Sequence, residues 1–93
     1  MQPTETYIHA MANYFDQSVA TASDDQLFAA GYLRGHIDLT VGTLQLQELP
    51  FTVDALQRQI EQSLQQAIDA GELNAADQLL VFDIWQQLQK LAD

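Results

Sequence analysis

The chain has 93 residues, of which 47 % are hydrophobic, a content that is too apolar for a disordered protein and sufficient for one modest core. Thirteen acidic residues against three basic ones give a net charge of −10, which repels nucleic-acid backbones and anionic lipids. The absence of cysteine excludes disulfides, thiolate zinc sites and cysteine nucleophiles.

We expect one domain over residues 1–93. The first residues lack the basic and apolar regions of a secretion signal, and no run approaches the ~20 apolar residues that a membrane span needs. These features predict a cytoplasmic protein that binds neither membranes nor nucleic acid directly. The acidity itself has two interpretations, solubility alone or attraction for a basic partner.

Apolar residues at three- and four-residue spacing predict an all-α protein with helices over about residues 4–21, 24–47, 53–70 and 75–92. In the first helix, Thr4 or Thr6 is the candidate cap. The inward stripe expected for that helix consists of Ile8, Met11, Phe15, Val19 and Ala22.

The second helix has the clearest start, because Ser23 and Gln26 have the spacing of a capping box. Its inward stripe is predicted as Leu27, Ala30, Ile37, Val41 and Leu44, and Arg34 occupies the position that this series skips. Gly31 and Gly35 lie one turn apart beside Arg34. Glycine costs about 1 kcal/mol in a helix relative to alanine, so the pair indicates a face where a neighbouring backbone or the Arg34 side chain needs room.

Pro50 ends the second helix, and Thr52 and Asn74 are candidate caps of the two helices that follow. Gly71 is a typical residue just beyond a helix end. Short connections favour a four-helix bundle with antiparallel neighbours in up-down-up-down order. In the main alternative, the first helix packs obliquely over the other three.

An arginine on an inward stripe needs a carboxylate partner, because an unpaired buried charge is costly. Asp83 lies in an apolar stretch of the last helix, so we expect Arg34 to pair with Asp83 or Asp77 and to fix the register of the second and fourth helices. An i,i+4 pair with Asp38 is an alternative. The pair is either structural or part of a ligand or partner cleft.

No other pattern indicates catalysis. His9 and His36 lack the spacing of metal ligands, and the serines lack the glycine-flanked motif of a hydrolase nucleophile. His36 is predicted to be a surface or boundary residue. Phe28, Tyr32, Phe82 and Trp85 are predicted at the core or its edge, and an exposed member of the Phe82–Trp85 pair would mark an interface. We therefore predict a protein that is not an enzyme and has no cofactor.

The segments ASDDQLFAAGYLRGH at 22–36 and SLQQAIDAGEL at 63–73, with DQ at 77–78 and DIW at 83–85, resemble the YfcL family of small gammaproteobacterial proteins. The resemblance implies a bacterial, cytoplasmic protein. The family has no established activity, so no catalytic residue is carried over. The resemblance rests on Gly31, Arg34, Gly35, His36, Glu72, Leu73, Asp83 and Trp85.

These observations favour a non-catalytic interaction or adaptor module that acts through residues 31–36 and the turn at 71–73. The candidate site comprises Gly31, Arg34, Gly35, His36, Glu72, Asp83 and Trp85. One alternative is a small protein or enzyme that holds an anionic ligand with Arg34, and another is an acidic mimic of nucleic acid. The expected partner is a protein of unknown identity, and a homodimer is possible.

Overall fold

The computed structural model describes residues 3–92, and within them it contains helices and no strand. The helices are α1 (Thr4–Ser18), α2 (Asp24–Leu46), α3 (Val53–Asp69) and α4 (Ala75–Lys90). The protein is therefore an all-α four-helix bundle. The extreme ends of the predicted 1–93 domain, residues 1–2 and 93, lie outside the described part of the chain.

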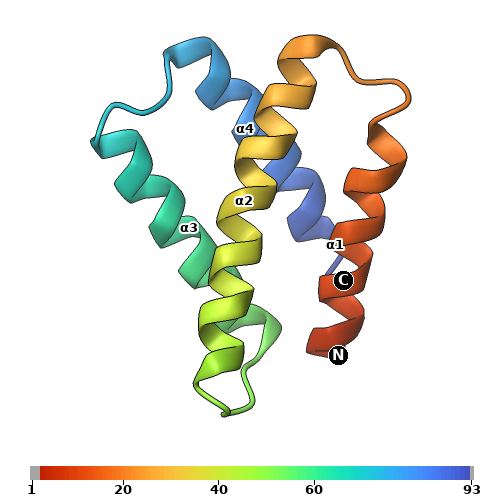
Figure 1. Ribbon diagram of the computed structural model, residues 1–93, viewed down its shortest axis with the longest axis vertical. Helices are drawn as coiled ribbons and strands as arrows, with labels where there is room; N and C mark the ends of the chain where they lie inside the picture. Colours follow the sequence, from red (N-terminus) through yellow and green to blue (C-terminus); the bar gives the residue numbers. More distant parts are fainter. Residues whose placement is uncertain (1–2, 93) are drawn as a thin grey trace.

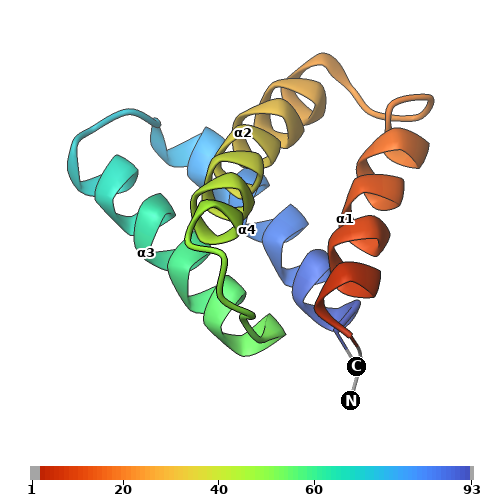
Figure 2. The same ribbon diagram turned by 60° about the horizontal axis from the view of Figure 1, so that its bottom comes forward.

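Helix α2 is the centre of the arrangement. It crosses in front of α4 in Figure 1, with α3 on one side and α1 on the other, and it packs on both α3 and α4. Figure 2 shows the same order from a second direction, with the helix axes splayed rather than aligned like four rods. One long side of α2 consequently faces away from the other three helices.

Local capping fixes where three of the helices begin. Ser23 accepts a hydrogen bond from the Gln26 backbone N–H while the Gln26 side chain accepts one from the Ser23 backbone N–H, so the predicted capping box is confirmed. Thr52 and Asn74 also cap their helices as predicted. Gly71, with φ +78°, adopts the left-handed conformation that ends α3.

The first helix differs from its prediction at both ends. Pro3 precedes its first turn without a side-chain cap, and the Thr4 hydroxyl instead donates to the Phe51 carbonyl oxygen at 2.7 Å. The helix ends at Ser18, before the expected end near residue 21. Val19 therefore lies in solvent and not on the inward stripe.

The core lies where all four helices meet. Its fully buried large side chains come from every helix: Tyr7, Met11, Leu33, Leu56, Ile60, Leu64, Val81 and Leu88. The Tyr7 hydroxyl donates to the Leu88 carbonyl oxygen and accepts from the Gln57 side-chain amide, each at 3.0 Å. These two bonds join α1 to α4 and α3, and they satisfy a phenol that would be costly to bury unpaired.

Only the first part of the inward stripe of α2 differs from the prediction, and the later members of the stripe are buried as predicted: Ile37, Val41 and Leu44. Leu33 is completely buried and Ala29 lies on the same face, whereas Leu27 is exposed. The large Leu33 side chain removes more apolar area from water than Ala30 does, so the helix turns Leu33 inward. Arg34 then falls at the edge of the stripe and not within it.

Candidate interaction site

The solvent side of α2 carries apolar and very small side chains instead of the usual charges. We define the α2 outer face as Phe28, Gly31, Gly35, Leu39, Gly42 and Leu46. Phe28 is 53 % exposed, Leu39 69 % and Leu46 85 %. At 100° per residue these six positions lie within one sector of the helix, opposite the buried Leu33 and Ile37.

The three helical glycines of this face have no packing role inside the molecule. A Cβ atom added at Gly31, Gly35 or Gly42 would have no neighbour within 4 Å. The expectation that Gly31 and Gly35 make room for a neighbouring helix is therefore wrong within this chain, and Arg34 extends toward Asp16 of α1 instead of over the glycines. Between the three large apolar side chains, the glycines leave the backbone of α2 open to solvent.

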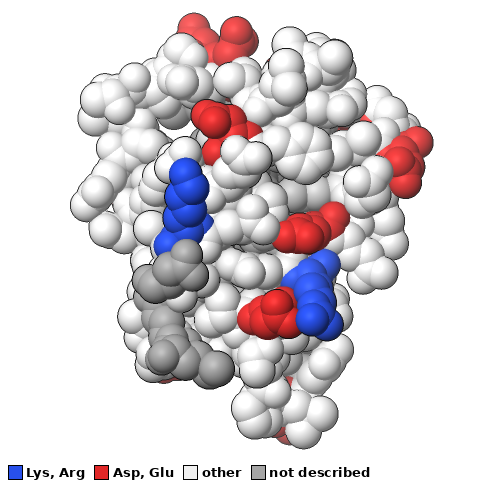
Figure 3. Space-filling model, turned by 180° about the vertical axis from the view of Figure 1, so that it is seen from behind, with Lys and Arg blue, Asp and Glu red and all other residues white. Residues whose placement is uncertain are grey.

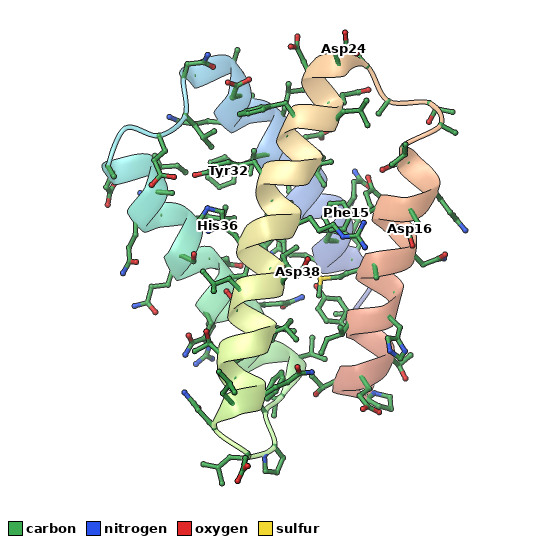
Figure 4. All side chains as sticks on the ribbon, in the orientation of Figure 1. Phe15, Asp16, Asp24, Tyr32, His36 and Asp38 are labelled. Atoms are coloured by element: carbon green, nitrogen blue, oxygen red, sulfur yellow. The ribbon has the colours of Figure 1, made fainter. Side chains whose placement is uncertain are left out.

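A group of polar side chains lies beside the outer face, between α2 and α3. The Tyr32 hydroxyl donates to Glu72 Oε1 at 2.7 Å, and His36 Nδ1 lies 2.7 Å from Ser63 Oγ. The Tyr32 and His36 rings are 4.8 Å apart. Figure 4 shows both rings on the α3 side of α2. We call these four residues the α2–α3 polar cluster.

The environment of Tyr32 favours its neutral form. Burial of the phenol, with the hydrogen bond to Glu72 and the negative charge of that carboxylate, raises the pKa of Tyr32 to about 12. Tyr32 therefore stays protonated near neutral pH and remains a hydrogen-bond donor to Glu72. The bond joins α2 to the turn after α3, so it links the predicted residues 31–36 with the predicted turn at 71–73.

The His36–Ser63 contact has the distance of a nucleophile and its base, and it joins α2 to α3. Both residues lie in the middle of helices, where the backbone N–H groups are used by the helices themselves. Backbone N–H groups used in this way are not free to stabilise an oxyanion. The contact is a hydrogen bond between helices, and it places His36 at a half-buried boundary as predicted.

Arg34 pairs with a carboxylate of α1 and not of α4. Its Nη1 lies 3.2 Å from Asp16 Oδ1, and its guanidinium carbon lies 5.6 Å from the centre of the Phe15 ring. The predicted partners Asp83 and Asp77, and the alternative Asp38, are thus all wrong. The side chains of Arg34 and Asp16 are 40 % and 69 % exposed, so this is a surface pair that joins α1 to α2. Figure 4 shows Phe15 and Asp16 on the side of α1 that faces α2.

Asp83 and Trp85 are separated from the other candidate residues. Asp83 is exposed and lines a pocket of about 260 Å³ that also includes Tyr14 and Gln26. Trp85 is buried in the core, and its indole N–H has no hydrogen-bond partner within residues 3–92. Of the two aromatic residues predicted to compete for the core, Phe82 is the exposed one, at 38 %.

A cleft of about 140 Å³ lies beside Arg34, between α1 and α2. It is smaller than the 300–1,000 Å³ or so of typical small-molecule sites. Asp38 lines it, and Asp16 already occupies the guanidinium. An anion would have to displace one carboxylate and approach another, which is unfavourable electrostatically.

The structure therefore brings together only part of the predicted site. His36 and Glu72 lie in the polar cluster, and Gly31 and Gly35 lie on the adjoining outer face. Sequence reasoning missed Tyr32 and Ser63 as members of this region, and also missed the exposed residues Phe28, Leu39 and Leu46. The signal for the latter three was available, since they recur at helical spacing opposite the core stripe.

The charged side chains on the side of the molecule opposite α2 are scattered and do not form a row (Figure 3). On the side opposite α2, Figure 3 shows acidic and basic side chains in small separate groups with uncharged surface between them. Within the described range, no His, Asp and Glu side chains gather in threes as a metal site would require. No helix among residues 3–92 is long and apolar enough to cross a lipid bilayer.

The fold places the protein in the class of small all-α four-helix bundles. The family model described as "YfcL protein" matches residues 5–90, and the chain belongs to that family. It is similar to a protein of Escherichia coli (strain K12) described as "Uncharacterized protein YfcL", with 47 % identity over 73 residues that cover 78 % of each chain. No solved structure matches the chain.

Proposed function

We propose that this protein is a non-catalytic protein-interaction module whose partner docks on the α2 outer face. The observation that carries this proposal is the set of three solvent-facing glycines within α2. Each costs about 1 kcal/mol of helix stability relative to alanine, and no neighbour within the molecule needs the space. A partner that lies close against the α2 backbone supplies a reason for that cost.

The exposed apolar residues support the same surface. Phe28, Leu39 and Leu46 are large side chains that remain mostly in water. Such residues scattered singly are ordinary, but a row along one helix is typical of an interface. The polar cluster adjoins this row and holds Glu72 at its edge through Tyr32.

Gly35→Gln tests the surface with little risk to the fold, because position 35 is exposed and glutamine forms helices better than glycine. The tagged wild type, Gly35→Gln and a matched control, Ala76→Gln, are used to recover partners from a lysate of the source bacterium. Ala76 is an exposed residue of a different helix, α4. We expect the wild type and the control to recover the same protein and Gly35→Gln to lose it. Equal recovery by all three proteins rejects the surface.

The alternative in which Arg34 holds a small anion has less support, because Asp16 already engages the guanidinium. Its test is direct. Arg34→Ala abolishes binding in that alternative, whereas docking on the outer face leaves partner recovery by Arg34→Ala unchanged.

A further inference from the structure

We infer that the partner presents a basic amphipathic α-helix, which lies along the α2 outer face with its apolar side inward and its lysines or arginines over the carboxylates at the edges. This inference rests on the proposed function and adds the chemistry of the partner. It follows from three features of the surface: its shape, the position of its acidic residues, and the position of its basic ones.

The shape suits a helix. The outer face extends from Phe28 to Leu46, about 27 Å at roughly 1.5 Å per residue, or five helical turns. Glycines separate the large side chains along it, so they leave gaps into which side chains of another helix fit. One such gap is an open hollow lined by Leu39, Gly42 and Leu46, with Asp38 at its edge.

Carboxylates border the outer face on several sides. Asp24 lies at its N-terminal end, and Figure 4 shows it at one end of α2. Asp38 lies on the α1 side, where it also lines the cleft between the two helices. Glu72 lies on the α3 side, held by Tyr32. All three residues are exposed, so a partner can reach them.

The basic residues are directed elsewhere. Arg34, the one cation in the sequence of α2, bonds Asp16 and lies over Phe15 of α1. Arg58 pairs with Asp54 within α3 at 2.9 Å. Lys90 ends α4. The border of the outer face therefore complements a positively charged helix, and this arrangement favours association with cationic partners and disfavours anionic ones.

The same charges argue against a second copy of this chain as the occupant. A twofold-symmetric contact would place the same surface on both sides, so the bordering carboxylates would meet one another. Each copy also carries a net charge of −10. Opposed like charges raise the free energy of association, and a basic partner removes that repulsion.

The test uses synthetic 18-residue amphipathic helices that share one alanine–leucine face and carry either lysine or glutamate on the other. A third peptide has the lysine composition in scrambled order and no apolar face. Fluorescence anisotropy measures the affinity of each for the full chain. We expect the lysine helix to bind at least ~10-fold tighter than both other peptides and to weaken as salt rises. Equal binding of the lysine and glutamate helices overturns the inference, as does equal binding of the scrambled peptide.

Two matched double variants distinguish the effect of the carboxylates that border the outer face from the effect of the net negative charge of the protein. Asp38→Asn with Glu72→Gln removes two charges at the outer face, and Glu61→Gln with Asp83→Asn removes two elsewhere. We expect the first pair to weaken binding of the lysine helix ~10-fold and the second to change it less than ~2-fold. Equal weakening by both pairs overturns the inference, because the attraction would then come from net charge alone. Dimerisation in sedimentation that Gly35→Gln abolishes also overturns it, because a second copy would then be the occupant.

The outcomes distinguish this inference from the proposed function. If Gly35→Gln loses its partner in the lysate but lysine helices show no preference, the surface stands and the partner chemistry is wrong. If Gly35→Gln recovers its partner normally, the proposed surface and this inference both fail.

Discussion

Arg34 is half-exposed and takes its partner from α1. Its charged group contacts Asp16, and its guanidinium carbon lies over the Phe15 ring. A surface ion pair contributes about 0–1 kcal/mol because water screens it and two long side chains must be ordered. The contact with the aromatic ring adds a similar amount at an exposed site. The residue therefore helps to hold α1 against α2, but it does not dominate the stability of the fold.

A double-mutant cycle measures this contribution. We expect Asp16→Asn to lower the free energy of unfolding by less than about 1 kcal/mol and Arg34→Leu by less than about 2 kcal/mol, with a coupling energy of about 0.5 kcal/mol that falls in high salt. Urea denaturation of the two single variants and the double variant gives these values. A loss of several kcal/mol for Arg34→Leu alone would contradict a surface pair and indicate a buried one.

Tyr32 makes stability depend on pH at the alkaline end. Its folded pKa, raised to about 12, lies above the ordinary value near 10, so between those values the unfolded chain releases the proton first. The stabilisation is fully present below pH 10 and is lost as pH rises toward 12. We expect the wild type to lose more stability than Tyr32→Phe over this interval, as measured by denaturation at a series of pH values. Burial also raises the pKa of Tyr7, but Tyr7 is present in both proteins and its effect cancels.

At the scale of the elements, the two faces of α2 differ in burial and in composition. One face buries Leu33 and Ile37 in the core, and the other exposes glycines that weaken the helix without any contact in return. Stability and function commonly oppose each other in this way at binding surfaces, which is the role proposed for this face. The helix is held by its capping box and by its packing on α3 and α4, so it tolerates the glycines.

Replacement of an outer-face glycine by alanine therefore stabilises the isolated protein. We expect Gly35→Ala to raise the free energy of unfolding by about 0.5–1 kcal/mol, because the added Cβ meets nothing within 4 Å and restricts the unfolded chain. Gly71→Ala is the contrasting control. At φ +78° alanine is strained, and we expect a loss of about 1–2 kcal/mol. A destabilising Gly35→Ala in thermal unfolding would show that position 35 has a structural role after all.

At the scale of the whole molecule, a small core leaves little stability in reserve. A domain of this size has a free energy of unfolding of about 5–14 kcal/mol. Trp85, from α4, is almost fully buried among residues of the other helices. We expect Trp85→Ala to cost about 3–5 kcal/mol, which is a large part of that total. Phe82→Ala, on the exposed side of the same helix, should cost much less in the same denaturation experiment. Similar losses in both variants would contradict the assignment of Trp85 to the core.

The number of helices and the position of their caps followed from local chemistry, and the candidate site followed only in part. Ser23, Thr52, Asn74 and Gly71 act within a few residues of themselves, so their roles are visible without tertiary contacts. The partner of Arg34 could not be predicted from local sequence, because it depends on how α2 is rotated about its own axis. The prediction placed Ala30 on the buried side of α2, whereas the structure places Leu33 there. Arg34 therefore lies toward α1 and not on the buried stripe.

The amino-acid sequence by itself determined that this protein is acidic, helical in all the regular structure of residues 3–92, and a member of one family, because composition, capping and hydrophobic spacing are properties of short stretches of chain. Only the tertiary structure decided that Asp16 meets Arg34, that Glu72 meets Tyr32, and that the glycines of α2 face solvent. Those contacts join residues far apart in the chain, and they depend on how each helix rotates to bury its largest apolar side chains. A spacing pattern indicates that rotation only to within a broad band of the helix surface.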